Sequence, residues 1–518
     1  MENWNWTKIF LLFSFIIFLG SLLLRQESAI TQDLGRHLRL GEMIIEGGPP
    51  DGEAGNTRKC ALYSNCLTYT YPDYPFINHH WGSEVIFYLV HKWTGFPGII
   101  IFKAVILGLA FGVTVLHSAS RGRSSPERTV LYTTAITLIF LSTQMMADRL
   151  TTRPEIFGYL LFSIVFFILS RSNIKCYITF YILPIIMLLW VNLHISFIFG
   201  LILIWLWAFS GLIKKGPTIL AIPAISTIIT LLNPSGLRGA LMPLSILKDY
   251  GYTIVENMTP FFLSAFKPQP EYWIYGILLI TTIVLFLFSP TKKNPFHLLT
   301  FLTFSLFPLT AVRHLPFFAL VLPPVLTPLV AVKFRPAEQG PAPQDKLHII
   351  VIGVLLIIAI TNPIPLAYGK LSPIGLVIDS RHNSAIEFVK QNSLQGPMWN
   401  NYDIGSYLEL TIPEHKTFVD GRPEAFPVGF FRQTYIPMQE DKANWDLITT
   451  KYDIQWVFAT LTDATPWFTK WWQMIQNHQG WRIVYIDNFS AVLVKTGGIN
   501  DSIQPQGKAR LLNSAGPN

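Results

Sequence analysis

Residues 177–213, YITFYILPIIMLLWVNLHISFIFGLILIWLWAFSGLI, form an apolar run that only Asn192-Leu193-His194 interrupts. As one α-helix the run would extend for about 55 Å at about 1.5 Å per residue, well beyond the roughly 30 Å hydrocarbon core of a bilayer. Two helices that reverse direction at 192–194, or a re-entrant pair, fit a membrane better. The stretch therefore predicts a polytopic membrane protein.

The rest of the chain supports this class. Of its 518 residues 51% are hydrophobic and only 14% are charged, whereas soluble domains carry about 25% charged residues. With the two halves of 177–213, we expect eleven transmembrane helices followed by a C-terminal soluble α/β domain. The other predicted spans are 8–24, 98–118, 129–146, 155–170, 218–232, 272–289, 296–311, 314–332 and 347–361.

The net charge of +8 is distributed in a way that predicts topology. Basic residues lie in alternate short gaps between the apolar runs rather than on one stripe, which argues against a nucleic-acid partner and for cytoplasmic loops. The first run lacks a cleavage pattern, so it is expected to remain as a span. The N-terminus is then cytoplasmic, and the loops 25–97, 147–154 and 233–271 and the C-terminal domain lie outside.

After the last apolar run, the composition of the sequence becomes that of a soluble domain. We expect a transmembrane domain over 1–362, a soluble α/β domain over 363–498 and a disordered tail over 499–518. Within the soluble domain, amphipathic helices alternate with strands, which favours a partly parallel sheet. The predicted helices are 384–392, 442–452 and 465–479, and the predicted strands are 454–460, 481–487 and 490–496. Residues 416–422 are predicted as a strand that runs into a turn.

Two of the three cysteines, Cys60 and Cys66, share the first outer loop. In an oxidising compartment they are expected to form a disulfide. A thiol–metal site is the alternative, but no nearby His or Cys completes one.

The first outer loop opens with QDLGRHLRLGEMI, residues 32–44. At helical spacing Asp33, Arg36 and His37 fall on one side of an interfacial helix, and leucines form a separate stripe. The structural alternative is that Asp33 caps the helix and pairs with Arg36.

Further polar side chains are predicted to face the same aqueous layer. MADRLTTRPE, 146–155, places Asp148, Arg149 and Arg153 between two spans, where charges are costly and usually functional. Paired histidines at 79–80 suit a metal, although helix capping or phosphate contact is the commoner use. The remaining candidates in these loops are Asn78, His79, His80, Glu84, His194, Arg313 and His314.

Acids, arginines and histidines beside apolar helices suit a lipid that carries an anionic headgroup. Arginines bind phosphate oxygens in a bidentate manner, and a groove between spans accommodates the lipid chain. One carboxylate is placed to accept a proton from an acceptor hydroxyl while a cation stabilises the departing phosphate.

The chain resembles the GT-C superfamily of polyprenyl-phosphate-sugar-dependent membrane glycosyltransferases, and especially a group of bacterial membrane proteins with that architecture. The resemblance rests on motifs in a shared order over about 8–498. These motifs are DLGRHLRLGE, NHHWGSEVIFYLVH, RPEIFGYLLF, WVNLHISFIFG, LLNPSG, VRHLPFFAL, NNYDIGSYLEL and FVDGRPEAF.

This resemblance implies roles for particular residues. Asp33 corresponds to the acid that activates the acceptor or holds a metal, with Asp148 as a further acid. A divalent cation, Mg²⁺ or Mn²⁺, is a candidate cofactor. The donor phosphate is assigned to Arg36, His37, Arg149, Arg153, Arg313 and His314.

Two motifs of the soluble domain are candidates for the acceptor side. Asp403 lies in NNYDIG, which is similar to the Trp-Trp-Asp-Tyr-Gly motif of oligosaccharyltransferases but lacks its tryptophan pair. That difference argues against binding of a peptide sequon, and Asp403 equally suits the cap of a helix that starts at Ile404. Asp420 and Arg422 follow a predicted strand, where either a ligand or a tight turn explains them.

The resemblance implies sugar transfer from a polyprenyl-phosphate donor to a glycan, lipid or protein acceptor, outside a bacterial inner membrane. Two other functions fit the same residues. One is transport or flipping of a lipid-linked glycan, against which the chain shows no inverted repeat. The other is a catalytically silent GT-C-like protein that serves assembly.

Overall fold

The structure is a computed structural model that describes residues 6–28, 33–47, 54–120, 125–171, 176–246, 248–266, 270–288, 294–331, 372–379 and 381–509. The chain divides into two compact units. The helical unit comprises Met1–Glu27, Thr94–Ser245 and Ile254–Val377. The mixed unit comprises Ser28–Trp93, Ile246–Thr253 and Ile378–Asn518. Each unit is described separately below.

This division corrects the predicted domain boundaries in one respect. The first outer loop, assigned above to the transmembrane domain, belongs with the C-terminal domain instead. Helix α2 (Leu34–Glu46) packs against α18 (Gly405–Thr411), and Thr68 forms a parallel β-bridge with Thr417. These contacts join residues more than 300 positions apart, so a division by position along the chain misses them.

The helical unit consists of apolar helices, and ten of the eleven predicted spans coincide with one. The eleventh, 347–361, lies outside the described residues. The helices are α1 (Trp6–Leu23), α4 (Trp81–Ala119), α5 (Ser125–Met145), α6 (Glu155–Ser170), α7 (Cys176–Leu193), α8 (Phe197–Lys215), α9 (Ala221–Ile228), α10 (Gly236–Leu241), α11 (Pro260–Phe266), α12 (Pro270–Phe288), α13 (Pro295–Thr310) and α14 (Leu315–Ala331).

Helix length separates these spans into classes. Within the described part of the chain, three helices are long and apolar enough to cross a membrane: 81–119, 270–288 and 312–329. A fourth span results if Pro217–Leu231 and Gly236–Leu244, bent by 118°, are counted as one. Six shorter apolar helices accompany them. The chain is thus a helical membrane protein, while the count of eleven crossings remains a prediction.

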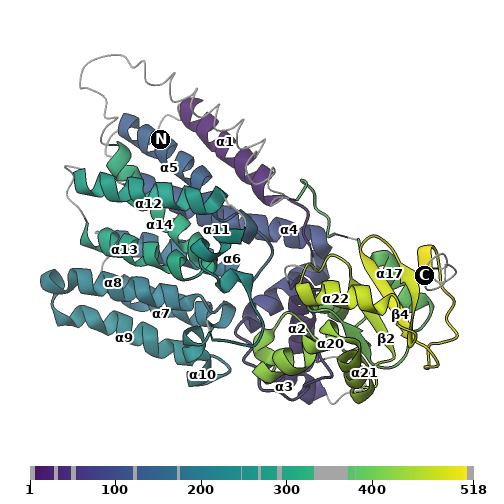
Figure 1. Cartoon of the computed structure of the whole chain (residues 1–518). Helices are drawn as coiled ribbons and strands as arrows, with labels where there is room; N and C mark the ends of the chain where they lie inside the picture. The colour runs from purple at the N-terminus through teal and green to yellow at the C-terminus, as the bar shows by residue number, and fades with distance from the viewer. Residues whose placement is uncertain are drawn as a thin grey trace. The chain divides into compact units, whose positions relative to one another are not determined.

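Helix α14 is the centre of the helical unit. Its apolar side chains are buried on all sides, as in Phe318, Ala319 and Val321, because α5, α6, α12 and α13 pack around it. Figure 1 shows α12 and α13 beside it. By contrast α12 exposes Ile277, Ile280 and other apolar side chains on its outer side. A helix that is apolar on every face, with one face exposed, is suited to lipid contact.

The run 177–213 reverses direction where predicted. Helix α7 ends at Leu193 and α8 begins at Phe197, and Figure 1 shows the two side by side with α9. In the turn the buried His194 pairs through Nδ1 with Ser196 Oγ at 2.7 Å, and Trp190 Nε1 donates to the same hydroxyl. His194 therefore stabilises the turn between α7 and α8.

Helix α4 belongs to both units and is broken between them. Gly95 adopts φ 66°, a left-handed conformation that interrupts the helix just before Pro97. Only glycine reaches this conformation without steric cost. The break separates the polar first turns of α4 from the apolar span predicted over 98–118.

The mixed unit contains a four-stranded sheet with strand order β1-β2-β4-β3. Strands β1 (Met398–Asn400) and β2 (Trp456–Thr460) are parallel, whereas β4 (Ser490–Lys495) is antiparallel to both β2 and β3 (Trp481–Ile486). The predicted partly parallel sheet is therefore confirmed. The helices of the unit are α2, α3 (Ala54–Tyr63), the start of α4, α17 (Asn383–Gln391), α18, α19 (Val428–Phe430), α20 (Pro437–Glu440), α21 (Lys442–Lys451) and α22 (Pro466–Ile475).

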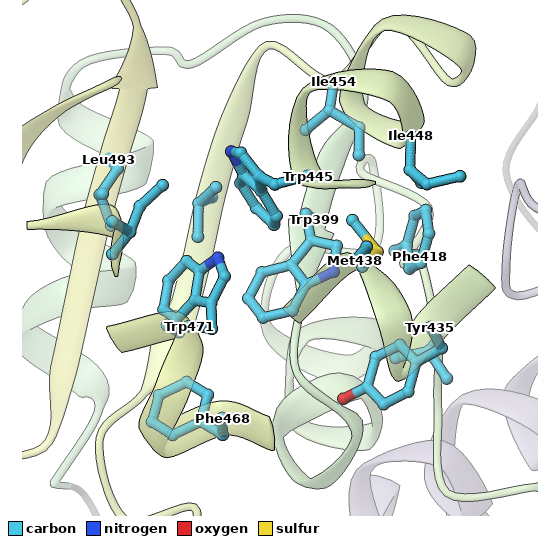
Figure 2. Close-up of a cluster of buried hydrophobic side chains, with 14 of the residues drawn as sticks. Trp399, Phe418, Tyr435, Met438, Trp445, Ile448, Ile454, Phe468, Trp471 and Leu493 are labelled. Carbon is cyan, nitrogen blue, oxygen red and sulfur yellow. The ribbon is translucent and has the colours of Figure 1, made fainter. Parts of the chain in front are cut away.

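Aromatic side chains fill the core on one side of this sheet. Trp399, Trp445 and Trp471 are fully buried, and their ring centroids lie 4.8–5.5 Å apart. Figure 2 shows these tryptophans with Tyr435 and Phe468 around them. Such rings each bury a large apolar area, so this core fixes the sheet against α20, α21 and α22.

Two sequence predictions for the mixed unit are wrong. The strand expected at the start of 416–422 is only an isolated bridge at Thr417, and a loop follows it as expected. Residues 499–509 of the predicted disordered tail are ordered, because Arg482 donates to the carbonyl of Ile503 at 3.0 Å and Ala509 is fully buried. These packing contacts outweigh the polar composition of the segment. The remainder, 510–518, lies outside the described residues.

Candidate functional site

The mixed unit places Asp33 at the start of α2, in the left-handed conformation with φ 54°. Its carboxylate accepts a hydrogen bond from Ser406 Oγ at 2.8 Å and lies 3.4 Å from Arg36 Nη2. The pairing with Arg36 is as expected, but among the described residues Asp33 makes no capping hydrogen bond. The side chain of Asp33 is 33% exposed to solvent. A non-glycine residue with positive φ is energetically costly and typical of functional sites.

Glycines allow three motifs to converge around this carboxylate. A Cβ on Gly421 would lie only 2.2 Å from Asp33 Oδ1, and one on Gly35 only 2.1 Å from the Ser406 carbonyl oxygen. A side chain at Gly35 would require the backbone to move, and one at Gly421 would displace the Asp33 carboxylate. DLGRH, YDIGS and VDGR therefore meet at one place, with Asp33 against the backbone of the DGR loop.

Behind Asp33 lies a buried ion pair. Arg422 donates from Nε to both carboxylate oxygens of Asp420, at 3.1 and 3.0 Å, and from Nη2 to Asn65 Oδ1 at 2.8 Å. Both charged side chains are 0% exposed. Burial opposes ionisation, yet Arg422 holds the pKa of Asp420 below its usual range. Full burial leaves neither residue a surface for the acceptor, so both act as internal supports.

Glu409, on α18, completes this interior. Burial and the charge of Asp420 raise the pKa of Glu409 well above its usual range, and the two carboxyl groups share a hydrogen bond. Thr417 Oγ1 donates to Glu409 Oε1 at 3.1 Å. Sequence reasoning missed this residue because ELT within a short helix has no distinguishing pattern.

The predicted metal-side residues Asn78, His80 and Glu84 lie together with His37, which the resemblance assigned to the donor phosphate. His37 Nδ1 pairs with Glu84 Oε1 at 2.9 Å, and Asn78 Nδ2 donates to Glu84 Oε2 at 2.6 Å. One ligand atom each of His37, His80 and Glu84 lies within 4.8 Å of the others. His79 instead turns its Nδ1 toward the carbonyl oxygen of Ile77, at 3.1 Å.

Asp403 lies at the exposed edge of the mixed unit, before α18. Although the Asp403 side chain reaches solvent, the protein atoms packed around its carboxyl group partly desolvate it and raise its pKa to about 6. The nearby carboxylates of Asp463 and Asp33 contribute to this increase. The helix begins at Gly405 and has no side-chain cap among the described residues, so the capping role considered for Asp403 is wrong. Beside it, Tyr252 stacks on Tyr402 with ring centroids 4.3 Å apart.

The two loop cysteines are free thiols that hydrogen-bond to each other. Donation by Cys66, together with Ser64, lowers the pKa of the Cys60 thiol to about 6, while burial opposes this shift. The predicted disulfide is not formed in this structure, although the two sulfur atoms are neighbours. Mutual proximity follows from α3, which ends at Tyr63 between them.

The helical unit contains a second group of charges, which we call the arginine cluster: Arg149, Arg153 and Arg313. Arg149 Nη1 contacts Glu256 Oε2 at 2.9 Å, and Arg153 Nη1 contacts Glu256 Oε1 at 2.6 Å. Arg313 Nη1 donates to Asn257 Oδ1 at 2.8 Å. One carboxylate thus lies between two guanidinium groups. Burial alone would raise the pKa of Glu256, but these arginines hold it well below its usual range.

Two further predicted site residues of the helical unit are Asp148 and His314. Asp148 is exposed in the short helix Ala147–Arg149, which also carries Arg149. His314 is buried, with Nδ1 3.0 Å from the carbonyl oxygen of Phe307, so it supports the turn between α13 and α14. The structure thus keeps Arg149, Arg153 and Arg313 together and gives His314 a local role.

Sequence reasoning missed three acids of the helical unit. Glu155 and Glu256 flank the arginine cluster, with Glu155 Oε1 at 3.6 Å from Arg149 Nη1. Glu27 forms a buried ion pair with Lys103 and accepts from the backbone N–H of Thr152 at 3.2 Å. The signal for that pair is Lys103, a single charge inside the apolar run 98–118. Such a residue requires a partner in a membrane.

No protein family and no curated protein matches the chain by sequence. Solved structures do match in fold. One is the archaeal oligosaccharyltransferase AglB from Archaeoglobus fulgidus, in complex with an inhibitory peptide and a dolichol-phosphate. It has a TM-score of 0.57 and 11% identity, over 94% of this chain and 74% of AglB.

Two further transferases share the fold. ArnT from Cupriavidus metallidurans, bound to undecaprenyl phosphate, matches with a TM-score of 0.53 and 12% identity, over 97% of this chain and 99% of ArnT. The mycobacterial arabinofuranosyltransferase AftD matches with a TM-score of 0.55 and 13% identity, over 96% of this chain and 40% of AftD. The chain therefore has the fold of the GT-C superfamily of polyprenyl-phosphate-dependent membrane glycosyltransferases.

Proposed function

We propose that this protein is a membrane glycosyltransferase that moves a sugar from a polyprenyl-phosphate donor to a hydroxyl group of a glycan, lipid or protein acceptor on the outer face of a bacterial inner membrane. The observation that carries the proposal is Asp33. It is a partly exposed carboxylate held in a strained backbone conformation by Ser406 and Arg36. A carboxylate that is oriented but still open to solvent is suited to proton abstraction.

In this proposal Asp33 accepts the proton of the acceptor as its nucleophilic atom bonds to the anomeric carbon of the sugar. The bond between that carbon and the phosphate oxygen breaks, and the polyprenyl phosphate leaves with the electron pair. Asp33 requires fixed orientation for this role, which its neighbours Gly421 and Ser406 supply.

The arginine cluster is our candidate for the donor phosphate. Guanidinium groups bind phosphate oxygens in a bidentate manner and remain charged when buried. The Glu256 carboxylate lies against Arg149 and Arg153. It therefore occupies the position that the donor phosphate would take in this proposal. Dolichol-phosphate in AglB and undecaprenyl phosphate in ArnT are ligands of the same chemical class.

The test replaces Asp33 by Asn, which retains the oxygen that accepts from Ser406 but removes the basic group. Membranes that contain the full chain receive a polyprenyl-phosphate donor with a radiolabelled sugar. We expect transfer to fall by a factor of about 100 to 10,000, the range for loss of a general base. Asp73→Asn, at an exposed position of the same loop, is the matched control. Equal activity of D33N and D73N would remove Asp33 from the mechanism.

A further inference from the structure

The side chains of His37, His80 and Glu84 form a group that the transfer mechanism does not use. His37 lies on α2, His80 lies just before α4, and Glu84 lies in the first turn of α4. All three belong to the mixed unit, so their separation is set within one compact body. We propose that they bind a zinc-class divalent cation that fixes α2 to the start of α4.

Geometry is the first support. In a tetrahedral zinc site with Zn–N bonds of about 2.0 Å, neighbouring ligand atoms lie about 3.3 Å apart. His37 Nδ1 and Glu84 Oε1 are 2.9 Å apart, and the whole set lies within 4.8 Å. His80 is half-buried, and a short movement of its imidazole would close the site. Binding replaces the proton now shared by His37 and Glu84, which is released.

The choice of metal follows from the ligand types. Two imidazoles and one carboxylate suit Zn²⁺ and related transition metals, whereas Mg²⁺ and Mn²⁺ favour oxygen ligands. The proposed ion and its ligands therefore differ from the Mg²⁺ or Mn²⁺ that the family resemblance places at Asp33. The half-buried side of His80 leaves a position for water as the fourth ligand.

Charge balance is the second support. Arg36 and Arg422 are the guanidinium groups that interact electrostatically with this interior, and Arg36 Nη1 lies 3.9 Å from Glu84 Oε1. They face a larger set of carboxyl groups on α2, α4, α18 and the 420–424 loop. These are Asp33, Glu84, Glu409, Asp420 and Glu424. The acidic side chains around the group thus exceed the guanidinium groups in number, a setting suited to a bound cation.

The third support is the environment of the carboxylate. Glu84 is 0% exposed, and Asn78 donates to its second oxygen at 2.6 Å. Metal-binding carboxylates are typically oriented in this way by a second hydrogen bond. Asn78 is therefore a positioning residue, because its amide holds Oε1 toward the imidazoles.

The location indicates a positioning role for the ion rather than a catalytic one. The guanidinium of Arg36 contacts Asp33 on one side and Glu84 on the other, at 3.4 and 3.9 Å. It therefore separates the reactive carboxylate from the metal. By holding α2, the ion would fix Arg36 and, through it, the orientation of Asp33.

The test measures metal content and does not depend on sugar transfer. The full chain, purified in detergent without a histidine tag and stripped with a chelator, is titrated with Zn²⁺ alone and then with Co²⁺. We expect one Zn²⁺ per chain and a visible absorption band with Co²⁺. Glu84→Gln and His80→Gln should each weaken binding by more than about 100-fold, and Asn78→Ala by about 10- to 100-fold.

Matched controls separate this site from the alternatives. His91→Gln, on the same helix but outside the group, should bind as the wild type does, and so should the Cys60→Ser/Cys66→Ser double variant. Should Glu84→Gln fail to fold, the partly exposed His80 still provides the variant that decides. Absence of Zn²⁺ from the wild type, undiminished binding by His80→Gln, or loss of binding in the double cysteine variant would each overturn the proposal.

Discussion

The Arg422 guanidinium is fully buried and contacts Asp420, Asn65 and the face of the Phe76 ring, whose centroid is 4.9 Å away. Removing one partner of a buried ion pair leaves the other charge without compensation. We therefore expect Arg422→Gln to destabilise the mixed unit by about 3–5 kcal/mol. The loss is measured as a lower midpoint of denaturant unfolding of the full chain in detergent.

The matched control for this substitution is Arg432→Gln. Arg432 pairs with Asp249, but both side chains are exposed, so water and salt already screen them. We expect no clear change in the unfolding midpoint. Similar losses for both variants would show that the buried position of Arg422 is not what matters.

Asp403 gives a prediction on pH dependence. Its pKa of about 6 in the folded chain lies above the ordinary Asp value of 3.8, so the folded state binds more protons between these values. Stability from this group is therefore present at low pH and is lost as pH rises through about 6. Because Asp403 is exposed, we limit the effect to about 1 kcal/mol.

The measurement compares thermal unfolding at pH 5 and pH 8 for the wild type and Asp403→Asn. The variant cannot ionise, so it should be more stable than the wild type at pH 8, and by about half as much at pH 5, which lies about midway between 3.8 and 6. A variant that is less stable at pH 8 would contradict the assigned shift.

At the scale of elements, the segment Val255–Asn257 contacts all three residues of the arginine cluster. It carries Glu256 to Arg149 and Arg153, and Asn257 to Arg313. If the donor phosphate binds these arginines, it competes with Glu256. Glu256→Gln removes the competing charge, so we expect polyprenyl phosphate to bind about tenfold more tightly, or about 1.4 kcal/mol.

Binding rather than turnover is the measurement here, for example by quantitative mass spectrometry of lipid retained by the purified protein. Glu440→Gln, which loosens an exposed ion pair with Lys470, is the control. Weaker binding by Glu256→Gln would show that Glu256 supports the site instead of occupying it.

Elements also show what the sequence is able to predict. The apolar runs are visible as composition, so helices such as α7, α8 and α14 are predicted with their approximate ends. The same is true of β3 and β4, whose residues alternate within a short distance. Strand β1 is only three residues long, so the local pattern does not predict it. The start of 416–422 has strand-like composition but forms only an isolated bridge, so the pattern predicts a strand that is not there.

At the scale of the molecule, the sequence predicts which residues matter better than it predicts what they contact. The motif residues Asp33 and Asp420 lie close together as part of one interior. Their supports are Ser406, Asn65 and Glu409, whose hydrogen bonds join residues hundreds of positions apart in two of the three cases. No local spacing encodes such contacts. Only the folded chain reveals that Arg422 is internal and that Asp33 is open to solvent.

The proposed function also requires a particular membrane topology. The distribution of basic residues predicts that Asp33, Asp148 and the C-terminal domain lie on the outer face. Single cysteines introduced beside each, in a cysteine-free chain, should all react with a membrane-impermeant maleimide added to intact cells. Protection of one position while the others react, with labelling restored after permeabilisation, would refute the topology.

The most direct test of sugar transfer follows both products in one reaction. Purified wild type and Asp33→Asn are reconstituted with a polyprenyl-phosphate sugar and a membrane extract that supplies acceptors, and mass spectrometry quantifies modified acceptor and free polyprenyl phosphate. The account predicts equal amounts of both products with the wild type and neither above background with the variant. Passage of the intact donor across the bilayer by wild-type protein, with no free polyprenyl phosphate formed, would contradict it.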